Sequence, residues 1–332
     1  MTLELQFFEY LQKSSPADAW SAILDQAWRL CAAPLTSSPS EKEILKRDRA
    51  VSDIDDFLAT SGWDLWQAYE KSVPLTSDRL VSWWRDCLGG KAILILDALS
   101  LRECPWLISQ AEARGFTIHD TNPTVAELPA DTTLFAKALG FTQRSDLSNN
   151  GSGSAHRLSD AHTESTDIPW RDCADLVGAE PFWFFWHHWP DRQIHNIYAK
   201  QGSGLLSLAN EAEANLTGDD FWFFVERLAT GRRVVITADH GYASSGNFPD
   251  ANKEQTEYLR EIFKGGRWNN VTDKPGACVP PLDLLLETRH GRHLFVNGRR
   301  KWKITGGYPT LTHGGLTILE VAVPWIEISK IN

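Results

Sequence analysis

The segment AILILD at residues 92–97 decides the fold class, because an unbroken apolar run ends there in a single carboxylate. Such a run is typical of a parallel strand that is buried on both faces. VVITADH at residues 234–240 repeats the pattern, and FWFFW at residues 182–186 is a third apolar run of strand length, which we interpret as core. This alternation predicts a doubly wound α/β fold, with a mostly parallel sheet flanked by helices. A fourth strand is predicted at 116–119, and helices at about 100–114, 132–139 and 219–228.

The chain divides into two regions of different texture. In residues 1–90 apolar residues recur at helical spacing, which predicts an N-terminal helical region that caps the rest or docks partner proteins. Residues 91–332 hold the strands and form the predicted catalytic domain. Within it, residues 145–167 are rich in Ser, Asn and Gly and poor in apolar side chains, so we expect a flexible insertion there.

Cysteine content, apolar stretches and net charge indicate which compartment and which classes of partner to expect. The 332 residues contain five scattered cysteines and no CxxC pair, which favours a reducing compartment such as the cytoplasm. The N-terminus lacks the pattern of a signal peptide, and no apolar stretch is long enough for a membrane span. A net charge of −10 argues against a nucleic-acid coat protein, but not against a short nucleotide bound through metal ions.

Three candidate ligands follow two of the predicted strands: Asp97 after the first, and Asp239 with His240 after the other. In open α/β sheets, ligands bind beyond the carboxyl ends of the strands. A buried carboxylate there is unfavourable unless it is paired or holds a cation. The alternatives are a helix N-cap at Asp97, and a strand-to-turn aspartate beside a surface histidine at 239–240.

Two further positions supply ligand types. Asp191 and His195 are four residues apart, which places both on one face of a helix. His313 precedes two glycines, which let the backbone come close to a ligand. Each has a plain alternative: a surface pair for the first, and an ordinary loop histidine for the second.

Thr132 follows LPAD at residues 128–131, just before an apolar helix, so it is either an N-capping residue or a nucleophile. Its hydroxyl can attack phosphorus only without its proton, and a nearby metal ion promotes that loss. The whole set contains three carboxylates, three imidazoles and one hydroxyl, enough for two divalent ions. Three carboxylates and one alkoxide balance the four positive charges of two such ions. These donors favour zinc, or else manganese, over magnesium.

In this order the motifs resemble the PglZ domain of the alkaline phosphatase superfamily, over about residues 91–326. The resemblance implies an alkaline-phosphatase-like fold, two divalent metal ions, and Thr132 as nucleophile, with Thr133 as the alternative. It implies one metal site of Asp191, His195 and His313, and another of Asp97, Thr132, Asp239 and His240. PglZ-like proteins are associated with phage defence and with signalling proteins that resemble nucleotide phosphodiesterases.

The sequence therefore predicts a two-metal phosphodiesterase that cleaves nucleotide or oligonucleotide phosphoesters through a phosphothreonine intermediate, in bacterial phage defence. The alternatives are a phosphomonoesterase, and a non-catalytic metal-binding scaffold in a defence complex. Arg299, Arg300 and Lys301 belong to the one dense basic stretch and are candidates to bind the substrate's phosphates. The other interpretation of that stretch is a solvated hairpin around Asn297-Gly298.

Overall fold

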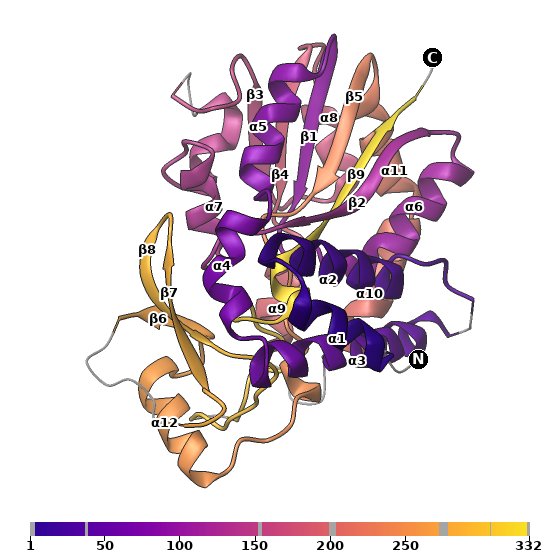
Figure 1. Cartoon of the computed structure of the whole chain (residues 1–332). Helices are drawn as coiled ribbons and strands as arrows, with labels where there is room; N and C mark the ends of the chain where they lie inside the picture. The colour runs from indigo at the N-terminus through magenta and orange to yellow at the C-terminus, as the bar shows by residue number, and fades with distance from the viewer. Residues whose placement is uncertain are drawn as a thin grey trace.

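The computed structural model describes residues 4–36, 39–151, 155–198, 204–271, 278–305 and 307–330, with the side chains of 196–198 left aside. Within these ranges a central six-stranded sheet is flanked by helices, and a small three-stranded sheet lies beside it (Figure 1). No helix in the described ranges is both long and apolar enough to cross a membrane.

The central sheet has the strand order β2-β9-β5-β1-β4-β3. β1 pairs in parallel with β4 and β5, and β3 in parallel with β4, whereas β9 runs antiparallel to both β5 and β2. The sheet is therefore mostly parallel, which confirms the predicted class of fold. Its strands are β1 (Gly90–Leu96), β2 (Thr117–Val125), β3 (His162–Thr166), β4 (Phe182–His187), β5 (Arg232–Thr237) and β9 (Ala322–Ser329).

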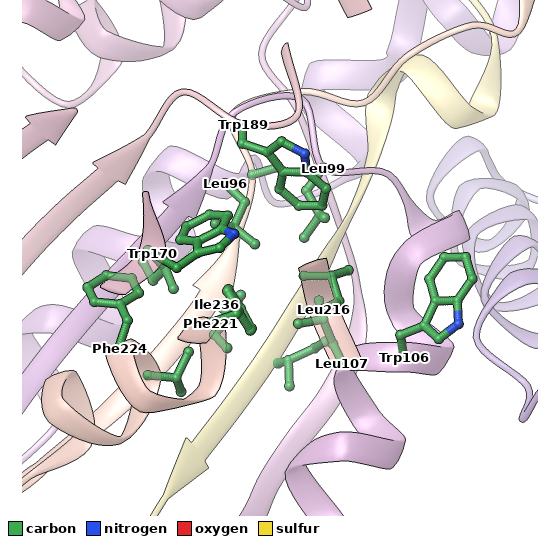
Figure 2. Packing of buried hydrophobic residues seen from close by; sticks show 14 of the residues in the cluster. Leu96, Leu99, Trp106, Leu107, Trp170, Trp189, Leu216, Phe221, Phe224 and Ile236 are labelled. Atoms are coloured by element: carbon green, nitrogen blue, oxygen red, sulfur yellow. The ribbon is translucent and has the colours of Figure 1, made fainter. Parts of the chain in front are cut away.

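Side chains of β1 alternate between the two faces of the sheet, and each face has its own core. Leu94 and Leu96 pack in a cluster with the helices of one face, where Trp170, Phe221 and Leu216 also lie (Figure 2). That face is covered by α6 (Cys104–Ala113), α8 (Trp170–Leu176), α10 (Leu205–Thr217) and α11 (Asp219–Ala229). Ile93 and Ile95 pack on the other face, against α5 (Thr76–Asp86) and α7 (Thr132–Ala138).

The N-terminal region is helical, as predicted. One of its helices, α3 (Ser40–Thr60), packs against α10, and Ile44 of α3 shares a buried cluster with residues of α10 (Figure 1). Trp20, Trp66 and Tyr69 are fully buried there and stack edge-on or tilted on one another. The same buried cluster includes Val125 and Leu319 from residues beyond 90, so the two regions share a core. The remaining helices of the region are α1 (Leu5–Lys13), α2 (Pro16–Cys31) and α4 (Asp64–Ser72).

A smaller lobe follows β5. It contains α12 (Lys253–Phe263) and the antiparallel sheet β6-β8-β7, and it has its own apolar cluster around Trp302. The strands are β6 (Trp268–Asn270), β7 (Asp283–Thr288) and β8 (Gly291–Val296). The β7–β8 hairpin therefore turns at Arg289-His290, and the predicted solvated hairpin around Asn297-Gly298 is wrong because Asn297 is buried after β8.

The stretch 145–167 is more regular than predicted. It contains most of the 3-10 segment η2 (Arg144–Asn150), and the edge strand β3, which pairs with β4. The expectation of a flexible insertion is wrong for residues 162–166. Backbone hydrogen bonds to β4 hold this strand in the sheet although its side chains are mostly polar. Residues 152–154 of this stretch lie outside the described residues. Other short segments are η1 (Leu101–Glu103), η3 (Ser245–Asn247), α9 (Asp191–Tyr198) and α13 (Ile318–Val321).

Candidate metal centre

Three adjacent strands bring the predicted acidic residues together. β1 lies between β5 and β4, so Asp97 after β1 lies between Asp239 after β5 and the start of α9 after β4. The backbone fixes these loops against each other, since Asp191 N donates to Asp97 O at 3.0 Å. Asp97 and Asp239 are fully buried. The residues predicted after β1, β4 and β5 therefore meet at the carboxyl edge of these parallel strands.

Thr132 is the first residue of α7, and its hydroxyl is directed at these strand ends. Oγ1 lies 3.3 Å from Asp97 Oδ1 and 3.3 Å from Nε2 of His240. The cap of the helix is Asp131, whose Oδ1 accepts from the amide of Thr133 at 2.9 Å. Because Asp131 caps the helix, the side chain of Thr132 is not needed as a cap and instead contacts the residues at the strand ends. Thr132 is thus the residue whose hydroxyl contacts Asp97 and His240, whereas Thr133 contributes its amide to the cap.

The first group of possible ligand atoms belongs to Asp97, Asp239 and His240, which lie within 4.8 Å of one another. Asp239 Oδ1 accepts from the amide of Ala98 at 3.0 Å, whereas its Oδ2 has no hydrogen-bond partner and is buried. His240 Nε2 lies 3.4 Å from that Oδ2. An unpartnered buried carboxylate oxygen is costly in a protein interior, and a cation would satisfy it.

The second group is Asp191, His240 and His313. Nε2 of His313 lies 3.8 Å from Asp191 Oδ1, which is also buried without a hydrogen-bond partner. His195 Nε2 lies 3.4 Å from Asp191 Oδ2, although the His195 side chain is 63% exposed. The structure therefore places His240 in both groups, whereas the sequence predicted it in one only.

The two buried histidines present the same nitrogen to the site. Nδ1 of His240 lies 2.9 Å from Gly241 O, and Nδ1 of His313 lies 3.2 Å from Ala130 O. A carbonyl oxygen can only accept, so Nδ1 carries the proton in both rings. Nε2 is then the nitrogen with the free lone pair, which is the arrangement that metal-ligating histidines use. The rings stack with centroids 4.2 Å apart.

The electrostatics of the centre also fit bound cations. Burial, together with the charges of Asp239 and Asp191, raises the pKa of Asp97 to about 8. Burial likewise raises the pKa of Asp239 to about 6. Burial also acts to raise the pKa of Asp191, but the hydrogen bond with His195, together with the neighbouring His313 and His240, holds this pKa below its usual range. Several carboxylates that lie close together and away from water repel one another, so a bound cation stabilises their charged form.

Two residues that the sequence interpretation missed contact Asp97. Arg144 Nη1 donates to Asp97 Oδ2, and Trp186 Nε1 donates to the same oxygen at 3.0 Å. Trp186 was assigned to the core as part of the aromatic run. Arg144 had one available signal, since it is the only Lys or Arg between Lys137 and Arg157.

A pocket of about 510 Å³ opens onto the centre. Four of the predicted site residues line it: Thr132, Asp191, His195 and His313. The remaining lining is polar and consists of Asp131, Thr133, Gln143, Arg144, Ser145, Ser148, Ser165 and His188. A small phosphorylated molecule can therefore reach the hydroxyl of Thr132.

The predicted basic residues do not line this pocket. Arg299 is 7% exposed and pairs with two buried carboxylates, Asp55 at 2.7 Å and Asp48 at 3.1 Å. Lys301 lies 3.6 Å from Asp250, and Arg300 Nε donates to Asn297 O at 3.2 Å. Their role in substrate binding stays a prediction.

Comparison with known proteins gives a faint structural likeness. No family model and no curated protein matches this chain. Murine ectonucleotide pyrophosphatase/phosphodiesterase 5 superimposes with a TM-score of 0.43 and 10% identity, over 72% of this chain and 87% of that one. An inactive form of the same murine protein in complex with AMP gives 0.42 and 10%, over 72% and 88%.

Phosphonoacetate hydrolase from Sinorhizobium meliloti, in complex with phosphonoformate, gives a TM-score of 0.38 and 12% identity, over 72% of this chain and 89% of that one. TM-scores this low assign neither the fold nor an activity. The fold is therefore defined by the sheet topology, and the resemblance to the PglZ domain stays a prediction.

Proposed function

We propose that this protein is a metal-dependent phosphodiesterase in which Thr132 attacks phosphorus. One observation supports this above the others. The hydroxyl of Thr132 contacts Asp97 and His240, which belong to the two groups of possible ligands, and Thr132 lines the pocket, while one buried carboxylate oxygen in each group lacks a hydrogen-bond partner. A scaffold without catalysis has no need of a hydroxyl placed there.

Asp97, Asp239 and His240 would hold one divalent cation, and Asp191, His195 and His313 the other, with His240 close to both. The oxygen and imidazole donors fit zinc or manganese. When bound, the two ions would lower the pKa of the Thr132 hydroxyl and offset the charge that develops on the phosphoryl and leaving oxygens.

The residues of the chain orient the reaction. Asp97 Oδ1 and His240 Nε2 fix the position of Thr132 Oγ1 from two sides. Oγ1, having lost its proton to solvent, forms a bond to phosphorus while the bond from phosphorus to one ester oxygen breaks, and that oxygen leaves with the electron pair and takes up a proton from water to become the alcohol. Water then attacks the phosphothreonine, breaks the bond to Oγ1 and releases the phosphomonoester.

The substrate that we propose is a nucleotide or short oligonucleotide, since metal ions and Arg144 supply the positive charge that an acidic chain otherwise lacks. The phosphomonoesterase alternative differs only in the group that the phosphoryl carries. A role in phage defence, with partner proteins bound through residues 1–90, is part of the same proposal and rests on the PglZ resemblance.

The test is turnover of a bis-aryl and a mono-aryl phosphate by purified protein loaded with Zn²⁺ or Mn²⁺. We expect the diester to be cleaved faster, and Thr132→Ala to abolish cleavage without loss of metal. Preferential cleavage of the monoester would show a phosphomonoesterase, and bound metal without turnover of either ester would show a scaffold.

A further inference from the structure

Arg144 connects the buried centre with the open pocket. Its guanidinium pairs with Asp97, which is fully buried, yet 26% of the Arg144 side chain is exposed and lines the pocket beside Thr132. The residue comes from η2 and lines the same pocket as Thr132. One side chain thus reaches both the proposed cation position and the space for the substrate.

The two oxygens of Asp97 have different partners. Oδ1 lies 3.3 Å from the hydroxyl of Thr132 and 3.8 Å from His240 Nε2. Oδ2 accepts from Arg144 and from Trp186 Nε1. The indole hydrogen bond is neutral and holds the carboxylate in place. The guanidinium is a full positive charge, and it occupies the same carboxylate that would ligate a cation.

A divalent ion at Asp97, Asp239 and His240 would weaken the attraction between Arg144 and Asp97. It would take the negative charge of Asp97 and place two positive charges close to the guanidinium, in a poorly solvated site where charges interact strongly. The other carboxylates of the pocket lining, Asp131 and Asp191, belong to the helix cap and to the second group of possible ligands. Asp131 caps α7 through Oδ1, and Asp191 contacts His195 and His313.

We propose that the guanidinium of Arg144 leaves Asp97 when a divalent cation binds there and then binds the non-bridging oxygens of the substrate's phosphoryl group. Guanidinium forms paired hydrogen bonds to phosphate oxygens as readily as to carboxylate. The cation and Arg144 therefore compete for Asp97, while the cation and the phosphate cooperate. This inference rests on the proposed phosphoester chemistry. It adds an order of binding, in which the cation binds first and the phosphoryl group second.

The proposal predicts effects of opposite sign for one substitution. In Arg144→Ala the first Zn²⁺ or Mn²⁺ binds more tightly than in the unaltered protein, by roughly tenfold, because its competitor for Asp97 is gone. Inorganic phosphate binds the metal-loaded variant more weakly, by roughly tenfold or more, because its guanidinium partner is gone. Without metal, phosphate binding is negligible in both proteins.

Titration calorimetry of the full chain measures both affinities without turnover, so the result can be read even if no ester is cleaved. Arg144→Lys keeps the positive charge but loses the paired hydrogen bonds, so cation affinity stays near that of the unaltered protein while phosphate affinity falls. Arg157→Ala is the matched control, an arginine paired with Asp78 that does not line the pocket. It should change neither affinity.

Weaker or unchanged cation binding in Arg144→Ala, in a variant whose melting temperature shows that it is folded, would overturn the exchange. Unchanged phosphate affinity would overturn the anion subsite. Failure of the proposed function looks different, because it would appear as intact cation and phosphate binding with no hydrolysis of any ester.

Discussion

Thr132 Oγ1 lies 3.3 Å from Nε2 of His240, although 108 positions of sequence separate the two residues. The contact joins the start of α7 to the loop after β5. It exists because Asp131 caps the helix and leaves the threonine side chain unused, and because Nδ1 of His240 is held by Gly241 O. The contact places a hydroxyl beside a histidine and a buried carboxylate, which is the arrangement on which the proposed function rests.

The first prediction concerns that hydroxyl. Thr132→Ala should lower kcat for an aryl phosphodiester by roughly a thousandfold or more, because the nucleophile is removed. The metal content and melting temperature should change little, since the three carboxylates and three histidines proposed to hold the cations remain and only a small, half-buried side chain is shortened. Thr133→Ala is the control, because Thr133 contributes its backbone amide to the cap and alanine keeps that amide. If Thr133→Ala were the inactive variant, the nucleophile would be one residue further along the chain.

The second prediction concerns metal content. Protein purified without chelators should contain up to two zinc or manganese ions per chain by elemental analysis, since six ligand side chains converge on the centre. Asp239→Asn should lose most of one ion and most of the activity, because Oδ2 of Asp239 is the buried oxygen without a partner. Removing metal should also lower the melting temperature, as any ligand bound only by the native state stabilises it. Equal metal content in Asp239→Asn would contradict the assignment.

The parallel strands could be predicted because burial on both faces leaves an unbroken apolar signature. β1, β4 and β5 all carry it. β3 and β9 do not. The sequence of β3, HTEST, is polar because an edge strand is held by its backbone hydrogen bonds to β4. β9 contains Pro324 and the buried Glu327, whose carboxylate lies 3.2 Å from Arg233, and neither residue suggests an interior strand.

The candidate ligands at the strand ends and the hydroxyl in the turn before α7 could be predicted, because the side-chain type of each residue and its place after a strand or before a helix can be read from the sequence. Arg144 and Trp186 could not, since each contacts Asp97 across a long stretch of sequence, 47 and 89 positions, that only the fold brings together. The basic stretch shows the converse. Arg299 looks free in the sequence, because the two aspartates that pair with it lie on α3, more than 240 positions away.

The third prediction concerns the backbone after His240. A Cβ at Gly241 would lie 2.3 Å from the carbonyl oxygen of Leu319, so Gly241→Ala forces the loop to move. We expect a loss of stability of about 1–3 kcal/mol and a fall in metal affinity of roughly ten- to a hundredfold, measured by chemical unfolding and by metal titration. Gly115→Ala separates the two effects. Its φ of +74° gives strain, but a Cβ there has no neighbour within 4 Å and is far in sequence from every proposed ligand, so stability should fall while metal affinity stays the same.

The last prediction decides what the basic stretch does. Arg299→Ala should lower the free energy of unfolding by about 3–5 kcal/mol, because two buried carboxylates, Asp48 and Asp55, lose a shared partner. Lys301→Ala should cost less than about 1 kcal/mol, because the Asp250 side chain that it pairs with is 74% exposed. Below the melting temperature, both variants should cleave an oligonucleotide and a small aryl diester with unaltered KM. A rise in KM for the oligonucleotide alone in Lys301→Ala, growing with salt, would instead show that this stretch binds the phosphates beside the scissile one.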